Sequence, residues 1–124
     1  MNKNRTLSYA DALNEALRQA MRISEDVFVF GQLVDSPAGI FHTTTGLVDE
    51  FGSKRVFDTP VAESAMTGVG LGAALMGMRP VLVHQRLDFM LFSMDLLVNW
   101  AALWRYKSAG KSGVPLTVRA IVGK

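Results

Sequence analysis

Glu63 is the residue of this sequence whose type and position best suit chemistry. It lies in the stretch Arg55 to Met78, which begins with the β-rich run Val56 to Asp58, turns at Thr59 and Pro60 and continues as a helix of small and apolar residues. A strand, a tight turn and a helix place Glu63 beside the carboxyl end of a strand. Open α/β sheets bind their ligands at that edge, so a carboxylate there is a candidate catalytic group.

A structural role for Glu63 is the alternative. The unpaired N–H groups and the dipole of a helix stabilise a carboxylate in its first turn. A full capping box requires Ser or Thr three residues before the glutamate, but Pro60 occupies that position and Thr59 lies one residue further back. Spacing alone favours simple dipole complementarity over catalysis, and both interpretations stay open at this point.

The glycines of the same helix suggest a different ligand. Gly68, Gly70 and Gly72, with Ala73, fit a loose G-x-G-x-x-A pattern, which is typical of dinucleotide-binding turns. In such turns the glycines follow the strand directly, whereas Gly68 lies well inside the helical segment. We therefore interpret the glycines as sites of close packing against a neighbouring element or subunit, at a cost of about 1 kcal/mol each relative to alanine.

The elements that must position Glu63 alternate between helices and buried strands. Ser8 is a typical N-cap with Asp11 as its capping partner, and an amphipathic helix follows it. Continuous apolar runs predict further strands. The strands expected besides Val56 to Asp58 are Val27 to Phe30, Pro80 to His84 and Val114 to Val122. This order predicts a three-layer α/β/α domain with a small, mostly parallel sheet.

Two further helices complete the expected fold. One is predicted over Thr43 to Phe51, closed by Gly52. The other is predicted over Leu91 to Ala109, with Asp88 as its N-cap. Because the second helix is apolar on most sides, something must bury it, and a second copy of the chain is the simplest candidate. Lys54 and Arg55 are interpreted as solvated loop charges.

Composition narrows the class of protein. The 124 residues, 49% of them hydrophobic, suit one globular domain. The net charge of +2 without long basic runs gives no indication of nucleic-acid binding. There are no cysteines, no apolar run long enough to span a membrane and no apolar core of a signal peptide. We therefore expect a cytoplasmic protein.

The sequence also resembles a known family. The run DTPVAES, followed by GVGLGAALMGMRPV, is similar to the beta subunit of the thiamine-diphosphate-dependent 2-oxo acid dehydrogenase component of the pyruvate, branched-chain or acetoin type. More broadly, it resembles the pyrimidine-binding domain shared with transketolase. The similarity runs from LSYADALNEALRQAM through VFVFG and RPVLVHQRLDFM to VPLTVRAIVG. It implies that residues 1–124 form a single truncated domain, without the C-terminal part of the family domain or the domain after it.

The resemblance implies roles for individual residues. In the family, the matching glutamate hydrogen-bonds to N1′ of the cofactor's aminopyrimidine and favours the imino tautomer, which takes the proton from C2 of the thiazolium. Glu63 occupies that position here. Phe89 matches the aromatic residue that packs on the ring, and Val61 matches an apolar neighbour of the ring. Judged without the resemblance, Phe89 is more simply a core residue.

Two departures from the family set limits on this hypothesis. Gln32 stands where relatives have an acid linked to proton movement between active sites, and an amide cannot carry a proton in that way, although it can contact the cofactor. Either the chemistry does without this acid, or the chain has lost full activity. The chain also lacks the Gly-Asp-Gly signature that holds Mg²⁺ and the diphosphate. The resemblance therefore implies half of a thiamine diphosphate site, completed by an alpha-type diphosphate-binding subunit. The alternative is a non-catalytic homo-oligomer that keeps the fold without the enzyme activity.

Overall fold

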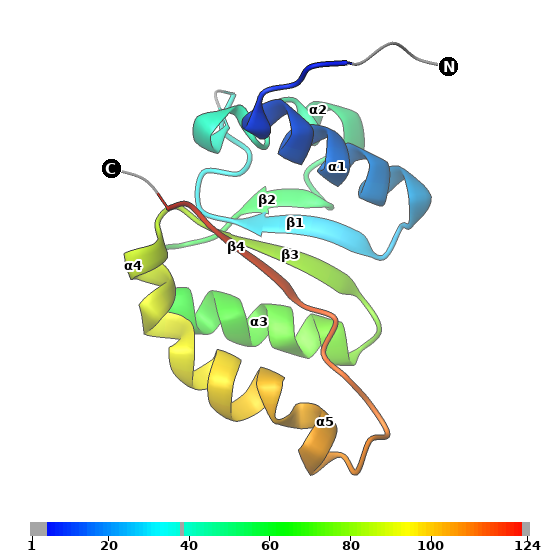
Figure 1. Cartoon of the computed structure of the whole chain (residues 1–124), viewed down its shortest axis with the longest axis vertical. Coiled ribbons are helices and arrows are strands. Elements are labelled where there is room, and N and C mark those ends of the chain that lie inside the picture. The colour runs from blue at the N-terminus through cyan, green and yellow to red at the C-terminus, as the bar shows by residue number, and fades with distance from the viewer. Residues whose placement is uncertain (1–4, 38, 123–124) are drawn as a thin grey trace.

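The computed structural model describes residues 5–37 and 39–122. Figure 1 shows a parallel sheet with helices on both of its faces, which is the predicted three-layer architecture. The elements in chain order are α1 (Tyr9–Ile23), β1 (Val27–Gly31), η1 (Ile40–His42), α2 (Leu47–Phe51), β2 (Val56–Asp58), α3 (Glu63–Leu75), β3 (Arg79–His84), α4 (Leu87–Met90), η2 (Leu91–Ser93), η3 (Leu96–Ala102), α5 (Trp104–Lys107) and β4 (Thr117–Ala120). Helices α1 and α2 cover one face of the sheet, and α3 with the helical segments after β3 covers the other.

The sheet has the strand order β2-β1-β3-β4 in the described residues, and every neighbouring pair is parallel. Its register places Gly31 beside both Asp58 and Val83. The carboxyl ends of β1, β2 and β3 therefore meet at one edge. Because β1 is buried on both faces, it consists of apolar residues throughout and closes with Gly31, where an added Cβ would lie 2.1 Å from the carbonyl oxygen of Val83.

The core between the sheet and α1 depends on the amphipathic pattern of that helix. Ser8 caps α1 as predicted, since its side chain accepts a hydrogen bond from the backbone N–H of Asp11 at 3.1 Å. The buried residues on this side of the sheet belong to α1, β1, the loop after β1, α2, β2 and β3. They are Met21, Val27, Val29, Val34, Leu47, Val56 and Val83.

The opposite core contains Phe28, Phe30, Met66 and Leu82. Gly70 of α3 faces this core, where an added Cβ would lie 3.0 Å from both the Phe30 ring and Leu116. At Gly72 an added Cβ would meet nothing within 4 Å. The glycines therefore lie inside a helix and not in a turn after a strand. Gly70 allows the predicted close packing, in which α3 lies against Phe30 and Leu116 of the same chain.

The structure corrects the predicted helix over Thr43 to Phe51. Helix α2 begins only at Leu47, after a turn in which Gly46 has a φ of 72°. Thr43 and Thr44, which precede the turn, are buried. Only the predicted closing residue is correct, because Gly52 ends the helix with a φ of 77°.

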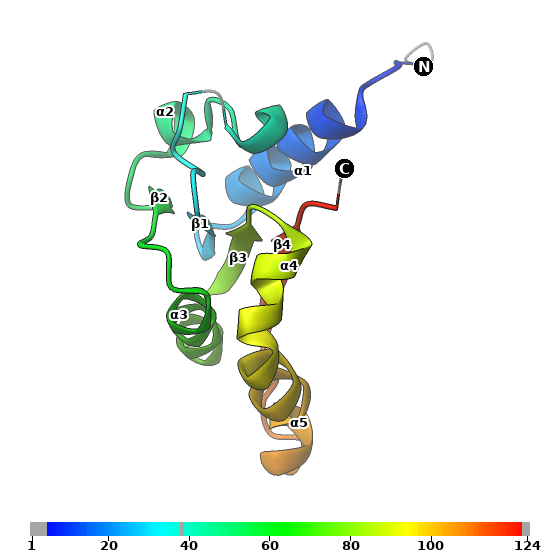
Figure 2. The same cartoon turned by 90° about the vertical axis from the view of Figure 1, so that its left-hand side faces the viewer.

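The predicted helix over Leu91 to Ala109 is also wrong in its form. Helical structure starts at Leu87 and passes through α-helical, 3-10 and π-helical turns, with a 60° bend between Leu87–Ser93 and Leu96–Lys107. Figure 2 shows these segments leaving the carboxyl edge of the sheet and running towards α5. Asp88 is not the N-cap, because Arg86 occupies that position, and the Asp88 carboxylate forms an ion pair with Arg86 at 3.1 Å.

Two shorter corrections concern the predicted strand Val114 to Val122 and Arg55. Strand β4 is limited to Thr117–Ala120. Arg55 is not a solvated loop charge, because its half-buried guanidinium donates hydrogen bonds to the carbonyl oxygens of Met21, Ser24 and Val27 at 2.7–3.1 Å. It therefore ties the turn between α1 and β1 to the start of β2.

Within the part of the chain that the structure describes, no single helix is long and apolar enough to cross a membrane. The segments Leu87–Ser93 and Leu96–Lys107 reach the required length and hydropathy only when they are counted together across their bend.

Candidate functional site

The candidate site lies where the carboxyl ends of β1 and β3 meet the start of α3. Glu63 is the first residue of α3, and no side chain among the described residues caps this end of the helix, where the N-cap residue is Ala62. Glu63 is half-buried. The helix therefore presents a carboxylate at the sheet edge without using that carboxylate in a capping box.

Gln32 is the direct partner of Glu63. It follows β1 immediately, is only 3% exposed, and its Nε2 donates a hydrogen bond to Glu63 Oε1 at 3.2 Å. The same nitrogen lies 3.7 Å from the sulfur of Met66, one turn further along α3. The second carboxylate oxygen, Oε2, accepts no hydrogen bond from the described residues. A buried amide therefore orients one side of the carboxylate and leaves the other oxygen available to a ligand.

The backbone of Glu63, like its side chain, is held by hydrogen bonds. Its carbonyl oxygen accepts hydrogen bonds from the hydroxyls of Thr67 at 2.9 Å and Ser93 at 3.0 Å. Ser64 donates in turn to the carbonyl oxygen of Phe92 at 2.6 Å. The bonds that involve Ser93 and Phe92 join the first turn of α3 to η2. The segment after β3 therefore contributes to the position of Glu63.

Asp58 organises the loop that follows Gln32, a role that sequence reasoning missed. Its carboxylate accepts hydrogen bonds from the backbone N–H groups of Leu33, Val34 and Asp35 at 2.6–3.2 Å. Leu33 takes a left-handed conformation with a φ of 58° in this loop. The available signal was the position of Asp58 at the end of β2, beside the end of β1. Desolvation and then the charge of Asp58 raise the pKa of Asp35.

His84 lies beneath the site and is the second residue that sequence reasoning left without a role. It is fully buried, and neither of its ring nitrogens has a hydrogen-bond partner in the described residues. Because side chains alternate along a strand, His84 points to the same face of the sheet as Leu82, which packs beside Met66 of α3. Burial lowers the pKa of His84, while the negative charge of Glu63 acts in the opposite direction. The imidazole is therefore a neutral neighbour of Glu63 at pH 7.

The other two expected site residues, Val61 and Phe89, form no hydrogen bond with this pair in the part of the chain that the structure describes. Val61 is 79% exposed, two positions before Glu63. Phe89 is half-buried in α4, and the guanidinium carbon of Arg86 lies 5.7 Å from the centre of its ring. The structure thus brings Gln32 and Glu63 into contact and leaves Val61 and Phe89 on the neighbouring loop and helix.

These features define a class of protein: an α/β domain with a parallel sheet and a half-buried carboxylate at the carboxyl edge of its strands. The comparisons with known proteins make the assignment specific. Residues 5–124 match the model of the transketolase pyrimidine-binding domain, and the chain belongs to that family.

The curated relatives are beta subunits of 2-oxo acid dehydrogenases. The chain is 44% identical over 117 residues to the 2-oxoisovalerate dehydrogenase subunit beta of Bacillus subtilis (strain 168). The matched residues make up 94% of this chain and 36% of the relative. It is 40% identical over 118 residues to the pyruvate dehydrogenase E1 component subunit beta of Rhizobium meliloti (strain 1021). Here the matched residues make up 95% of this chain and 26% of the relative. The chain therefore spans about a third or less of the length of these relatives.

Proposed function

We propose that this chain forms the aminopyrimidine half of a thiamine diphosphate site in the oxidative decarboxylation of a 2-oxo acid, with Glu63 as the catalytic residue. The hydrogen bond from Gln32 Nε2 to Glu63 Oε1, with a length of 3.2 Å, carries the proposal. It orients the carboxylate and leaves the other oxygen, Oε2, available to accept a hydrogen bond from the cofactor. A carboxylate oxygen is a strong acceptor for a ring N–H. The thiamine dependence of the family and the identity of the relatives support this assignment.

The residues present fit the aminopyrimidine. Glu63 would accept the hydrogen bond from N1′, and Val61 and Phe89 would contact the faces of the ring. Gln32 is a positioning residue that holds the carboxylate from the buried side. When bound, thiamine diphosphate supplies the carbon nucleophile that attacks the carbonyl of the 2-oxo acid. The contribution of this chain is to hold a proton at N1′ through Glu63 and to keep water from the buried side of the carboxylate with Gln32 and His84.

The diphosphate and Mg²⁺ are assigned to a partner of the alpha type. In the described residues, no group of three or more His, Cys, Asp or Glu side chains could hold a metal ion. Mg²⁺ usually binds through carboxylates together with substrate phosphates. A complete site on this account therefore requires this chain and a second, diphosphate-binding chain, and the chain alone is expected to be inactive.

Calorimetric titration of thiamine diphosphate with Mg²⁺ tests this proposal, with and without an alpha-type subunit. The expected result is binding that requires the partner and weakens at least tenfold in Glu63→Ala. Glu25→Ala is the matched control, because Glu25 is an exposed glutamate outside the site. Absence of binding in every combination of folded chains would overturn the proposal.

A non-catalytic homo-oligomer is the second candidate function, and the segments after β3 favour it. Large apolar side chains are exposed there, with Phe92 at 70% and Tyr106 at 86%. The others are Leu91, Met94, Val98, Trp100 and Leu103. Contiguous exposed apolar side chains mark contact surfaces between proteins. A second copy of the chain that covers these residues would remove them from water.

Light scattering coupled to size-exclusion chromatography tests the homo-oligomer. The expected result is a mass that rises with concentration for the wild type and falls to that of one chain in Phe92→Lys. Ile23→Lys is the matched control, since Ile23 is 85% exposed on α1, and its mass should equal that of the wild type. A wild-type monomer at micromolar concentration would contradict this candidate.

A further inference from the structure

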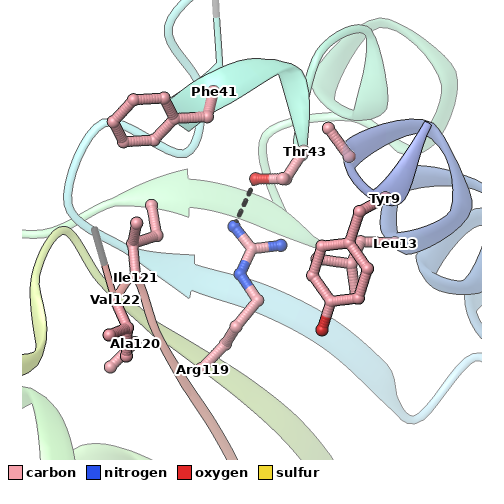
Figure 3. A pocket seen from close by; sticks show the side chains of 9 residues that line it. Tyr9, Leu13, Phe41, Thr43, Arg119, Ala120, Ile121 and Val122 are labelled. Atoms are coloured by element: carbon pink, nitrogen blue, oxygen red, sulfur yellow. Dashed lines mark hydrogen bonds between the residues drawn. The ribbon is translucent and has the colours of Figure 1, made fainter. Parts of the chain in front are cut away.

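A cavity of ≈ 420 Å³ lies on the α1 face of the sheet, opposite to the face covered by α3. Figure 3 shows its walls, which come from the first turns of α1, the segment around η1 and the end of β4. Most of the lining is apolar and includes Leu13, Phe41, Ile121 and Val122. The volume falls within the range of small-molecule sites in proteins, about 300–1,000 Å³.

Arg119 is the charged residue of this lining. In the sheet register it lies beside Val83, whose side chain packs on the α1 side, so Arg119 projects to the same face. Its Nη2 donates a hydrogen bond to Thr43 Oγ1 at 2.6 Å, as drawn in Figure 3. Its Nε and Nη1 are buried and have no hydrogen-bond partner in the described residues.

Arg119 therefore lacks both a counter-charge and acceptors for two of its guanidinium nitrogens in the described residues. No carboxylate forms an ion pair with Arg119 among the residues that the structure describes, and burial lowers the pKa of its guanidinium. A buried cation without an anionic partner is costly, because it has lost water without gaining a counter-charge. An anion in the cavity would supply both the missing charge and the missing hydrogen-bond acceptors.

The segment that covers the cavity is strained. Phe41 and His42 take left-handed conformations, with φ of 49° and 61°. Each such residue costs on the order of 1–3 kcal/mol, and this kind of strain gathers at ligand sites. Phe41 belongs to the lining of the cavity, and 68% of its surface is exposed. A ligand with an apolar body would cover part of that surface.

We infer that this cavity binds a small organic monoanion, namely a carboxylate carried on a short apolar body. The carboxylate pairs with Arg119, whose planar guanidinium matches the two oxygens of a carboxylate. A single charge is expected because Arg119 is the one cationic residue of the lining in the described residues. The apolar body then packs against Leu13, Phe41 and Ile121. The site is separate from Glu63 and does not depend on the thiamine proposal.

Calorimetric titration of hexanoate into the full chain tests the inference. Hexan-1-ol has the same apolar body without the charge, and inorganic phosphate has charge without an apolar body. Arg119→Met removes the cation, and Ala10→Phe fills the cavity without changing its charge, because Ala10 belongs to the lining. Arg105→Met is the matched control, since Arg105 is exposed on α5. Circular dichroism confirms that each chain is folded.

The expected result is hexanoate binding that is unchanged in Arg105→Met and at least tenfold weaker in both Arg119→Met and folded Ala10→Phe. Hexan-1-ol should bind the wild type at least tenfold more weakly than hexanoate does. Three results would overturn the inference: no hexanoate binding to the folded wild type, equal binding to Arg119→Met, or tighter binding of phosphate than of hexanoate through Arg119.

Discussion

At the scale of single residues, the contact between Gln32 and Glu63 is the most informative feature of the site. The resemblance to 2-oxo acid dehydrogenases indicated an acid in place of Gln32, so that either the chemistry does without this acid or the chain has lost full activity. In the structure the Gln32 amide is 3% exposed and donates a hydrogen bond to Glu63 Oε1. An acid at position 32 would place a second carboxylate beside the first.

Gln32→Glu should therefore destabilise the fold. Two carboxylates in contact cannot both ionise at little cost, and position 32 is shielded from water. We expect a loss of about 1–3 kcal/mol at pH 7.5 in urea denaturation. Gln19→Glu is the matched control, because Gln19 makes the same contact with Glu15 at 3.1 Å on the exposed surface of α1. An equal effect of the two substitutions would contradict the account.

His84 gives the fold a predictable pH dependence. Its pKa is lowered in the folded state, so the unfolded chain binds its proton first as pH falls. The stability associated with neutral His84 is thus present above the ordinary imidazole pKa and is lost as pH falls through the lowered value. We expect His84→Leu to lose less stability than the wild type between pH 7.5 and 5.5, as measured by urea denaturation. A parallel loss in both chains would show that His84 is not responsible.

At the scale of elements, α3 combines close packing with the presentation of Glu63. Gly70→Ala should destabilise the chain by about 1 kcal/mol or more, because the new methyl group would overpack the core between Phe30 and Leu116. Gly72→Ala should stabilise it by up to about 1 kcal/mol, since alanine favours the helix and meets nothing nearby. Thermal and urea denaturation of the two variants measure the difference. Stabilisation of similar size in both would refute the packing role of Gly70.

Arg55 connects three elements through the backbone. Arg55→Met removes the donors to the carbonyl oxygens of Met21, Ser24 and Val27. We expect a loss of about 1–3 kcal/mol in the free energy of unfolding. Lys54→Met, at an exposed neighbouring position, should change stability by less than about 0.5 kcal/mol. The prediction fails if the two variants unfold at the same urea concentration.

The sequence correctly predicted those elements that are determined by local sequence alone. Strand β1 is a continuous apolar run, and Ser8 is a local cap, so neither depends on distant contacts. The helical region after β3 was mispredicted as one regular helix. The pattern of its apolar residues does not indicate the π-helical turns of η3 or the bend before them. Those features depend on tertiary contacts, such as the hydrogen bond from Ser93 to the carbonyl oxygen of Glu63.

At the scale of the whole molecule, the chain divides its two candidate sites between opposite faces of one sheet. Glu63 was predicted from its position after β2 and from the family resemblance. Arg119 was not, because an arginine at a strand end carries no local signal of what lies opposite to it. Only the parallel register, which places Arg119 beside Val83, shows that its guanidinium enters the α1 side.

The central claim is that Glu63 contacts N1′ of the aminopyrimidine. A thermodynamic cycle tests it most directly. Thiamine diphosphate and an analogue that has CH in place of N1′ are titrated by calorimetry into the wild type and Glu63→Ala, in the presence of Mg²⁺ and an alpha-type subunit. We expect the wild type to bind the analogue at least tenfold more weakly than the cofactor. Glu63→Ala should bind the two within about threefold, because neither N1′ nor the carboxylate contributes to this contact without the other. Equal discrimination against the analogue by both chains would show that another residue contacts N1′.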